Sequence, residues 1–197
     1  MTLMSIVMSI FTTGIIQIYR SVVRTEAVSG AQSQLNTAFL RLDREVRYAA
    51  EISEPGPGPG REPRVEFRTS HTGDAVTCTQ LRLVVDSAGG RLQRRTWEYV
   101  PDRLTGSPLK NLTPFTTLAS AVAAGTAAGL PAGQPFQRTL APVSAATGTA
   151  DQRLRVVLTV RSAPGGSLRR TDVTFTTLNS SIPVPTPEVC DEGRTLP

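Results

Sequence analysis

The sequence predicts an α+β fold in which one long N-terminal helix packs on an antiparallel β-sheet. Residues 1–49 contain no proline, and they continue from an apolar half into an amphipathic half. Beyond residue 63, several segments alternate apolar and polar residues, which is typical of strands with one buried face. Short turns that contain glycine separate these segments and favour antiparallel pairing. The 197 residues suffice for one ordinary domain and an appendage.

The first half of the predicted helix, residues 1–19, carries no charged side chain. A helix of that length covers ~28 Å, close to the ~30 Å hydrocarbon core of a bilayer. We expect this half to lie in a membrane or in the core of a filament. Its apolar contact residues are predicted to be Leu3, Ile6, Val7, Ile10, Phe11, Ile15, Ile16 and Ile18.

Three interpretations of residues 1–19 remain open. A cleaved signal peptide would need a basic region before the apolar run, and none precedes it in this sequence. The segment could also be a plain signal anchor, or a helix that is held in the membrane at one time and packed against protein at another. Gly14 and several Ser and Thr residues favour the last interpretation, because small and hydroxyl residues allow close helix contacts. Arg20 and Arg24 follow the segment and, taken alone, would place the C-terminal side in the cytoplasm.

The second half, residues 20–52, is predicted to be an amphipathic helix that ends near Ala49. Its apolar residues recur at steps of three and four, and a sheet from the rest of the chain is the natural cover for them. Residues 53–63 are expected to be a Pro/Gly linker that ends the helix. This run lacks the strand-then-helix setting of a phosphate-binding loop. The residues predicted to pack on the sheet are Leu35, Phe39, Leu42 and Val46.

The β head is predicted to span residues 64–180, with strands at 65–69, 76–85, 92–100, 154–160 and 173–177. Leu81, Leu83 and Val85 are expected on one face of the second strand. The insert 101–150 is predicted to hold a short helix at 116–124 and loops at 125–134 and 141–150. Residues 181–197 are expected to be an extended tail. The only histidine, His71, falls in a predicted turn and is expected to be a loop residue, because a metal site needs several converging ligands.

The two cysteines, Cys78 and Cys190, fit no zinc or redox spacing. They suit a disulfide in an oxidising compartment, and two unpaired thiols are the alternative. A disulfide would join the tail to the second strand. In the chain-entropy model, closing so long a loop contributes roughly 4–5 kcal/mol.

The charge balance permits an anionic partner without demanding one. The net charge is +5 and the pI about 10, and Lys110 is the only lysine, a usage that fits GC-rich coding. No run of like charges forms a basic arm, so nucleic acid is not expected as a partner. The alternative is a contact with an anion on the last predicted hairpin, whose arginines otherwise form a solvated face. These arginines are Arg153, Arg155, Arg161, Arg169 and Arg170.

The segment Gln32–Ala49, above all Leu-Asp-Arg-Glu-Val-Arg-Tyr-Ala at its end, resembles the minor pseudopilins of the type IV pilin family, the kind found in tip complexes. The resemblance covers residues 1–52, and only the architecture is similar thereafter. It implies a pilin-like fold, with the helix half apolar and half amphipathic. Met1-Thr2-Leu3-Met4 is similar to the start of the mature family helix, but Ser5 stands where the family has Glu. We therefore expect Met1 to be an internal methionine, with the cleavage site and the Glu upstream; a family member without the Glu is the alternative.

The resemblance implies a structural subunit of a type IV pilus, a DNA-uptake pilus or a type II secretion pseudopilus. Its partners would be other pilins, the membrane and the assembly machinery, and it would be a bacterial single-pass protein with its head outside the cytoplasm. No enzyme, cofactor, metal or small-molecule substrate is expected, because no nucleophile and base stand at a known spacing. The alternatives are a membrane-anchored extracellular binding domain and a DNA-binding tip subunit.

Overall fold

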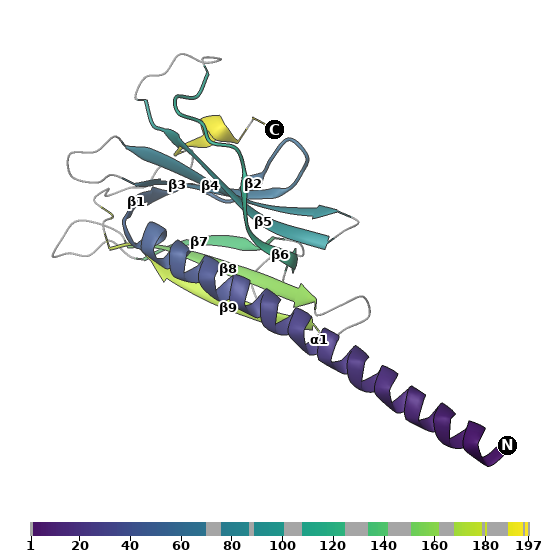
Figure 1. Cartoon of the computed structure of the whole chain (residues 1–197). Helices are drawn as coiled ribbons and strands as arrows, with labels where there is room; N and C mark the ends of the chain where they lie inside the picture. The colour runs from purple at the N-terminus through teal and green to yellow at the C-terminus, as the bar shows by residue number, and fades with distance from the viewer. Residues whose placement is uncertain are drawn as a thin grey trace.

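The computed structural model describes residues 2–69, 76–86, 89–100, 108–124, 134–141, 151–161, 168–178, 180, 189–194 and 196. The chain is α+β, with one long helix packed against an antiparallel sheet (Figure 1). The helix α1 spans Thr2–Arg47. The strands are β1 Ala49–Ile52, β2 Gly56–Pro57, β3 Pro63–Thr69, β4 Thr77–Asp86, β5 Gly89–Glu98, β6 Thr116–Ala124, β7 Phe136–Leu140, β8 Gln152–Arg161 and β9 Leu168–Thr176.

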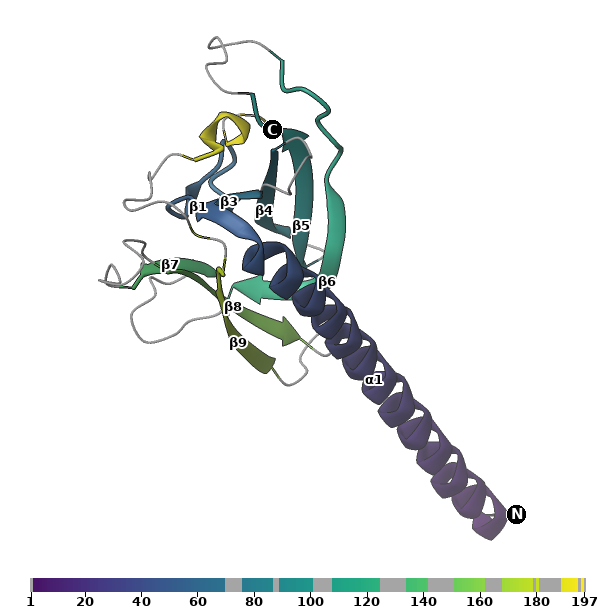
Figure 2. The same ribbon diagram turned by 90° about the vertical axis from the view of Figure 1, so that its left-hand side faces the viewer.

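The described strands form a curled sheet in the order β1-β3-β4-β5-β6-β8-β7, with β2 beside β3 and β9 beside β8. Every described pair is antiparallel, as the turn pattern predicts. The curl brings β7 and β8 round to the free edge of β1 (Figure 2). There the Gln152 amide oxygen accepts a bond of 2.9 Å from the Ile52 backbone N–H, and Arg138 donates one of 2.8 Å to the Ile52 carbonyl. Side chains thus satisfy this strand edge, which would otherwise leave backbone groups unpaired.

The second half of α1 lies in the concave side of the sheet and closes the core. Leu35, Phe39, Leu42 and Val46 are all buried there, as their spacing predicts. The core also takes in apolar side chains of β3, β4, β5, β6, β7, β8 and β9. The rings of Phe39 and Phe175 lie 6.1 Å apart, within the range of a favourable aromatic pair.

The predicted helix end is wrong by two residues, and the Pro/Gly run is not what ends the helix. The helix stops at Arg47, and Ala49–Ile52 form β1 rather than the last helical turn. The strand conformation gives these residues backbone partners on β3, while Ala49 and Ile52 stay fully buried. The backbone N–H of Leu178 donates to the Arg47 carbonyl at 2.9 Å, which satisfies one terminal group of the helix. The predicted linker 53–63 likewise contains the short strand β2.

The predicted helix at residues 116–124 is also wrong, because this segment is the strand β6. Its many alanines favour a helix by only a few tenths of a kcal/mol each. Pairing with β5 on one side and β8 on the other outweighs that preference, and it buries Ala119 and Val122. The insert 101–150 therefore supplies β6 and β7 to the sheet, and much of its predicted loop sequence lies outside the described residues.

Smaller differences concern strand ends and the C-terminus. The strands predicted at 76–85 and 92–100 are Thr77–Asp86 and Gly89–Glu98. Leu81 and Leu83 are buried, but Val85 is 61% exposed. Residues 189–194 are not extended, because they turn through a short 3-10 helix, Asp191–Gly193. His71 and residues 181–188 lie outside the described residues.

Candidate functional site

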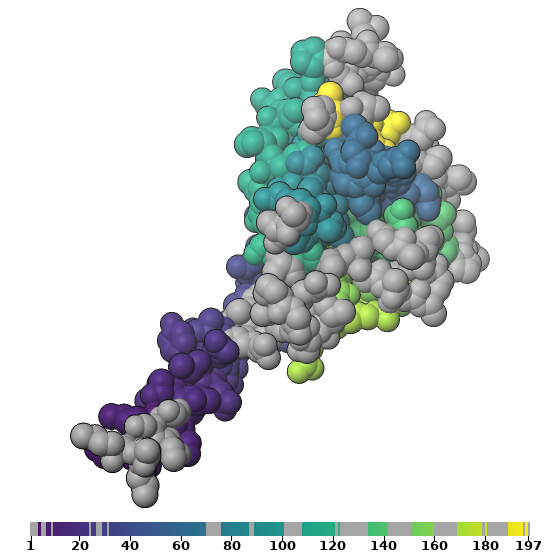
Figure 3. Space-filling view, turned by 90° about the vertical axis from the view of Figure 1, so that its right-hand side faces the viewer, coloured from purple at the N-terminus to yellow at the C-terminus, as the bar shows by residue number. Residues whose placement is uncertain are grey.

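The N-terminal half of α1 projects from the head as a stalk (Figure 3). Gln34 joins the helix to β6, because its amide oxygen accepts bonds from the Ser120 hydroxyl and N–H. Residues 2–34 of the helix extend ~50 Å at 1.5 Å per residue. Its large apolar side chains among the described residues are exposed, with Phe11 at 66% and Ile18 at 67%. They are Met4, Val7, Met8, Ile10, Phe11, Ile15, Ile16, Ile18, Tyr19, Val22 and Val23.

This exposed set contains the predicted contact residues Val7, Ile10, Phe11, Ile15 and Ile16, together with Ile18; the side chains of Leu3 and Ile6 lie outside the described part. Contiguous apolar patches on a protein surface are in general sites of interaction with protein or membrane.

Polar side chains on the stalk bond within the helix. The Thr12 hydroxyl donates to the Met8 carbonyl at 2.8 Å, and the Thr25 hydroxyl donates to the Ser21 carbonyl at 2.9 Å. Such bonds lower the cost of taking a hydroxyl out of water. In the part of the chain that the structure describes, no helix has a stretch both long enough and apolar enough to cross a membrane.

Cys78 and Cys190 form a disulfide, as their number and placement predict. Both are buried, and they pack with Val189 and Trp97, which faces Cys78 across the strands β4 and β5. The Trp97 indole N–H donates to the Glu192 carboxylate at 2.9 Å. The disulfide therefore fixes residues 189–194 against the side of the sheet that faces away from α1.

Polar and apolar residues alternate on β3 and β4, which suggests a solvated polar face. Residues 189–194, here called the C-terminal segment, cover this face and the neighbouring part of β5. Arg64, Glu66 and Gln80 are fully buried, and Arg95 is 3% exposed. Arg95 donates to the carbonyl of Gly193 at 2.7 Å. The sequence gives no local signal of this layer, because its cover comes from residues about a hundred positions away.

The polar layer is rich in arginine. Arg64 bonds to Glu62, and Arg194 bonds to Glu66, so both carboxylates in the layer have cationic partners. The guanidinium carbons of Arg82 and Arg95 lie 3.4 Å and 4.2 Å from the ring centroid of Phe115. Burial, followed by the nearby charges of Arg64 and Arg82, lowers the pKa of Arg95 to about 10. Arg95 thus stays charged at neutral pH, and the layer anchors the C-terminal segment.

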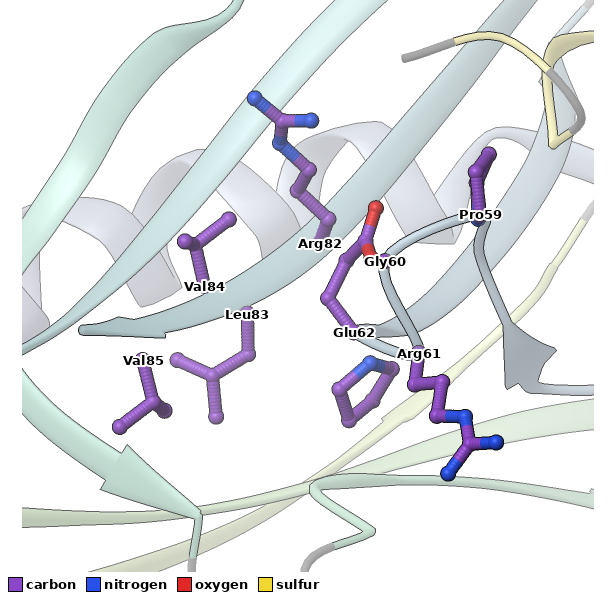
Figure 4. A pocket seen from close by; sticks show the side chains of 9 residues that line it. Pro59, Gly60, Arg61, Glu62, Arg82, Leu83, Val84 and Val85 are labelled. Carbon is purple, nitrogen blue, oxygen red and sulfur yellow. The ribbon is translucent and has the colours of Figure 1, made fainter.

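A cavity of about 510 Å³ lies beside this layer, between the loop Pro59–Pro63 and the end of β4 (Figure 4). Leu83, Val84 and Val85 line one side, and the Arg61 side chain points away from Arg82. A smaller cavity of about 310 Å³ lies where α1 meets β3, β4 and β5. Neither lining contains a histidine, cysteine or serine that could pair as nucleophile and base.

The single cluster of potential metal ligands found among the described residues is Cys78, Cys190 and Glu192. Its two sulfurs are bonded to each other, so neither is a free thiolate.

The structure does not bring the five hairpin arginines to one surface. Arg155 and Arg170 both donate to Asp172, at 2.7 Å and 3.0 Å, and the bond from Arg155 lowers the pKa of the Asp172 carboxyl. The register of β8 and β9 places Arg169 on the opposite face from Arg170. Arg153 is exposed, and the side chain of Arg161 lies outside the described part. Part of the positive charge is therefore neutralised locally.

Comparison of the chain with protein-family models, with curated proteins and with solved structures finds no match.

Proposed function

We propose that this chain is a structural subunit of a pilin-like filament, a minor pilin or pseudopilin rather than an enzyme. The apolar half of the helix is held in a membrane before assembly and packs against neighbouring helices in the filament core afterwards. The observation that carries this proposal is the continuous helix, which buries one face in the head from Leu35 onward and exposes apolar side chains before it. The resemblance of Gln32–Ala49 to minor pseudopilins supports it. The pilus, uptake or secretion system served is left open.

The energetics favour an interaction role for the stalk. Six of the exposed side chains, of the size of Val, Ile or Phe, are about half to two-thirds exposed, so burying the rest of them is worth on the order of 5–11 kcal/mol. That is comparable with the whole free energy of unfolding of a domain, so covering the stalk is strongly favourable. Exchanging lipid for other apolar helices keeps these side chains out of water. Transfer of the stalk from lipid into a filament therefore need not cost the full free energy of moving these side chains from lipid into water.

The disulfide agrees with a head outside the cytoplasm, where disulfides persist. It also ties down the C-terminal end of the head. The leading alternative is a membrane-anchored extracellular binding domain that never enters a filament. That alternative predicts lipid contacts for the stalk and no contacts with other subunits.

Photo-crosslinking in the cell that produces the chain separates the two. A photoreactive phenylalanine derivative replaces Phe11 on the stalk, and the control carries it at Val85, another exposed apolar site, on the head. We expect sheared filaments to contain the chain, with crosslinks from position 11 to other subunits about fivefold more frequent than from position 85. If position 11 reacts with lipid alone and the chain is missing from the filaments, the anchored domain is correct.

A further inference from the structure

The smaller cavity, of about 310 Å³, lies where the concave face of the sheet changes from apolar to polar. Side chains alternate along a strand, so Thr77, Thr79, Leu81 and Leu83 share one face of β4. The two leucines belong to the core under α1, and the two threonines continue the same row into the cavity. We call this space the Thr79 cavity. It is lined by Arg44, Glu45, Tyr48, Thr69, Thr77, Thr79 and Arg94.

Thr79 is a buried polar residue without a partner in the described part of the chain. It is 2% exposed, and its hydroxyl makes no hydrogen bond with any described residue. Buried hydroxyls are almost always hydrogen-bonded, because leaving one unpaired destabilises the fold. Valine has nearly the same shape and would avoid that penalty. A threonine at this position therefore indicates a partner that the described chain does not itself supply.

Arg94 brings further open donors to the same cavity. Its side chain is 16% exposed, and its Nε donates to the Glu45 carboxylate at 2.8 Å. The other oxygen of Glu45 accepts a bond of 2.9 Å from Arg41, so both carboxylate oxygens are occupied. The two terminal nitrogens of Arg94 have no acceptor among the described residues. Arg94 pairs with Leu81 across β4 and β5, which makes it a diagonal neighbour of Thr79 on one face.

The charge of the lining favours an anion. Arg44 is exposed on α1 and makes no ion pair with a described residue, so the lining holds two arginines against the single carboxylate of Glu45. The two terminal nitrogens of a guanidinium match two oxygens of a carboxylate or a phosphate. Both oxygens of a carboxylate would face Arg94. A phosphate group has further oxygens for the hydroxyl of Thr79 and for Arg44.

We propose that the Thr79 cavity binds a small phosphate, either free phosphate or the phosphate group of a small monoester. Arg94 donates to two of its oxygens through the terminal nitrogens, the Thr79 hydroxyl donates to a third, and Arg44 supplies a further positive charge from the helix. The ligand would thus join α1 to β4 and β5 and stabilise the folded head. This site does not depend on what covers the stalk.

Equilibrium dialysis of the full chain in a nonionic detergent, with radiolabelled inorganic phosphate at pH 7 and constant ionic strength, tests the proposal. We expect one phosphate to bind per chain. Thr79→Val and Arg94→Lys should each weaken binding about tenfold, because each removes donors to a charged group. Thr174→Val, at an exposed threonine of β9, is the matched control and should leave binding unchanged. Arg94→Lys keeps the positive charge, and it remains informative if Thr79→Val does not fold.

Thermal unfolding of the same variants separates a ligand site from a structural role. Without phosphate, Thr79→Val should unfold at the same temperature as the unmodified chain or higher, because no bond is lost. With phosphate, the unmodified chain should gain more in midpoint temperature than this variant does. A monoester source predicts that glycerol 3-phosphate competes better than inorganic phosphate, and a free phosphate source predicts the reverse. No binding, binding that Thr79→Val leaves unchanged, or acetate that competes as well as phosphate would each overturn the proposal.

Discussion

Removing the disulfide should cost this head a large part of its free energy of unfolding. The bond joins residues 112 positions apart, and in the chain-entropy model a loop of that length contributes about 4.8 kcal/mol. Whole domains are stable by only about 5–15 kcal/mol. We take the free energy of unfolding to decrease by about 2 kcal/mol per molar of urea. The urea concentration at the midpoint of unfolding should then be roughly 2.4 M lower for Cys78→Ser/Cys190→Ser than for the unmodified chain.

Trp97 provides the assay, since it is the only tryptophan and packs against the disulfide. Urea unfolding is followed by its fluorescence, with the stalk covered by a nonionic detergent. Unmodified protein under reducing conditions is the matched control, and it should give the same midpoint as the double serine variant. If the midpoint of unfolding decreased by less than about 0.5 M, the reasoning would be refuted. That result would mean that the disulfide restricts the unfolded chain much less than the chain-entropy model assumes.

Three further substitutions test the head. Leu42→Ala removes a fully buried side chain and should lower the free energy of unfolding by about 2–5 kcal/mol. Leu40→Ala, at a site 75% exposed, should change it by less than about 0.5 kcal/mol in the same urea titration. Asp172→Asn removes a carboxyl whose folded-state pKa lies below the ordinary 3.8 because Arg155 donates to it. Its stabilisation is present above that value and is lost as pH falls through the lower folded pKa. The variant should thus be less stable than the unmodified chain at pH 7, and the difference should shrink as the pH falls below 3.8 through the lowered folded-state pKa. A difference that stays constant over that range would contradict the assignment.

The buried faces of α1 and β8 could be predicted from the sequence, because they follow from the local spacing of apolar residues. The stripe that includes Leu42 and Val46 repeats at helical spacing, and an α-helix places such residues on one face whatever surrounds it. The alternation of Leu154, Val156 and Leu158 likewise identifies the buried face of β8, and all three side chains are fully buried. In both places, the apolar pattern and the local backbone preference agree.

Features that depend on distant partners could not be predicted. Residues 116–124 are rich in alanine, and only the edges of β5 and β8 make them a strand. Arg64 and Arg95 are charged residues, which strands usually expose, yet residues 189–194 bury them. The helix end at Arg47 depends in the same way on β3.

The exposed apolar side chains of the stalk and the stripe that packs on the sheet lie on one unbroken helix, so the helix should fix the orientation of the head in an assembly. Gly30 lies between them, is exposed, and has open space around its Cα. One alanine inserted after it would rotate the head by about 100° relative to the stalk, whereas seven alanines would rotate it by only about 20° and lengthen the helix by ~10 Å. If the stalk packs in a filament that also fixes the head, the single insertion should reduce incorporation into sheared filaments and the seven-residue insertion should restore much of it. Equal incorporation of both would mean that the stalk is only a tether, because a tether transmits no rotation.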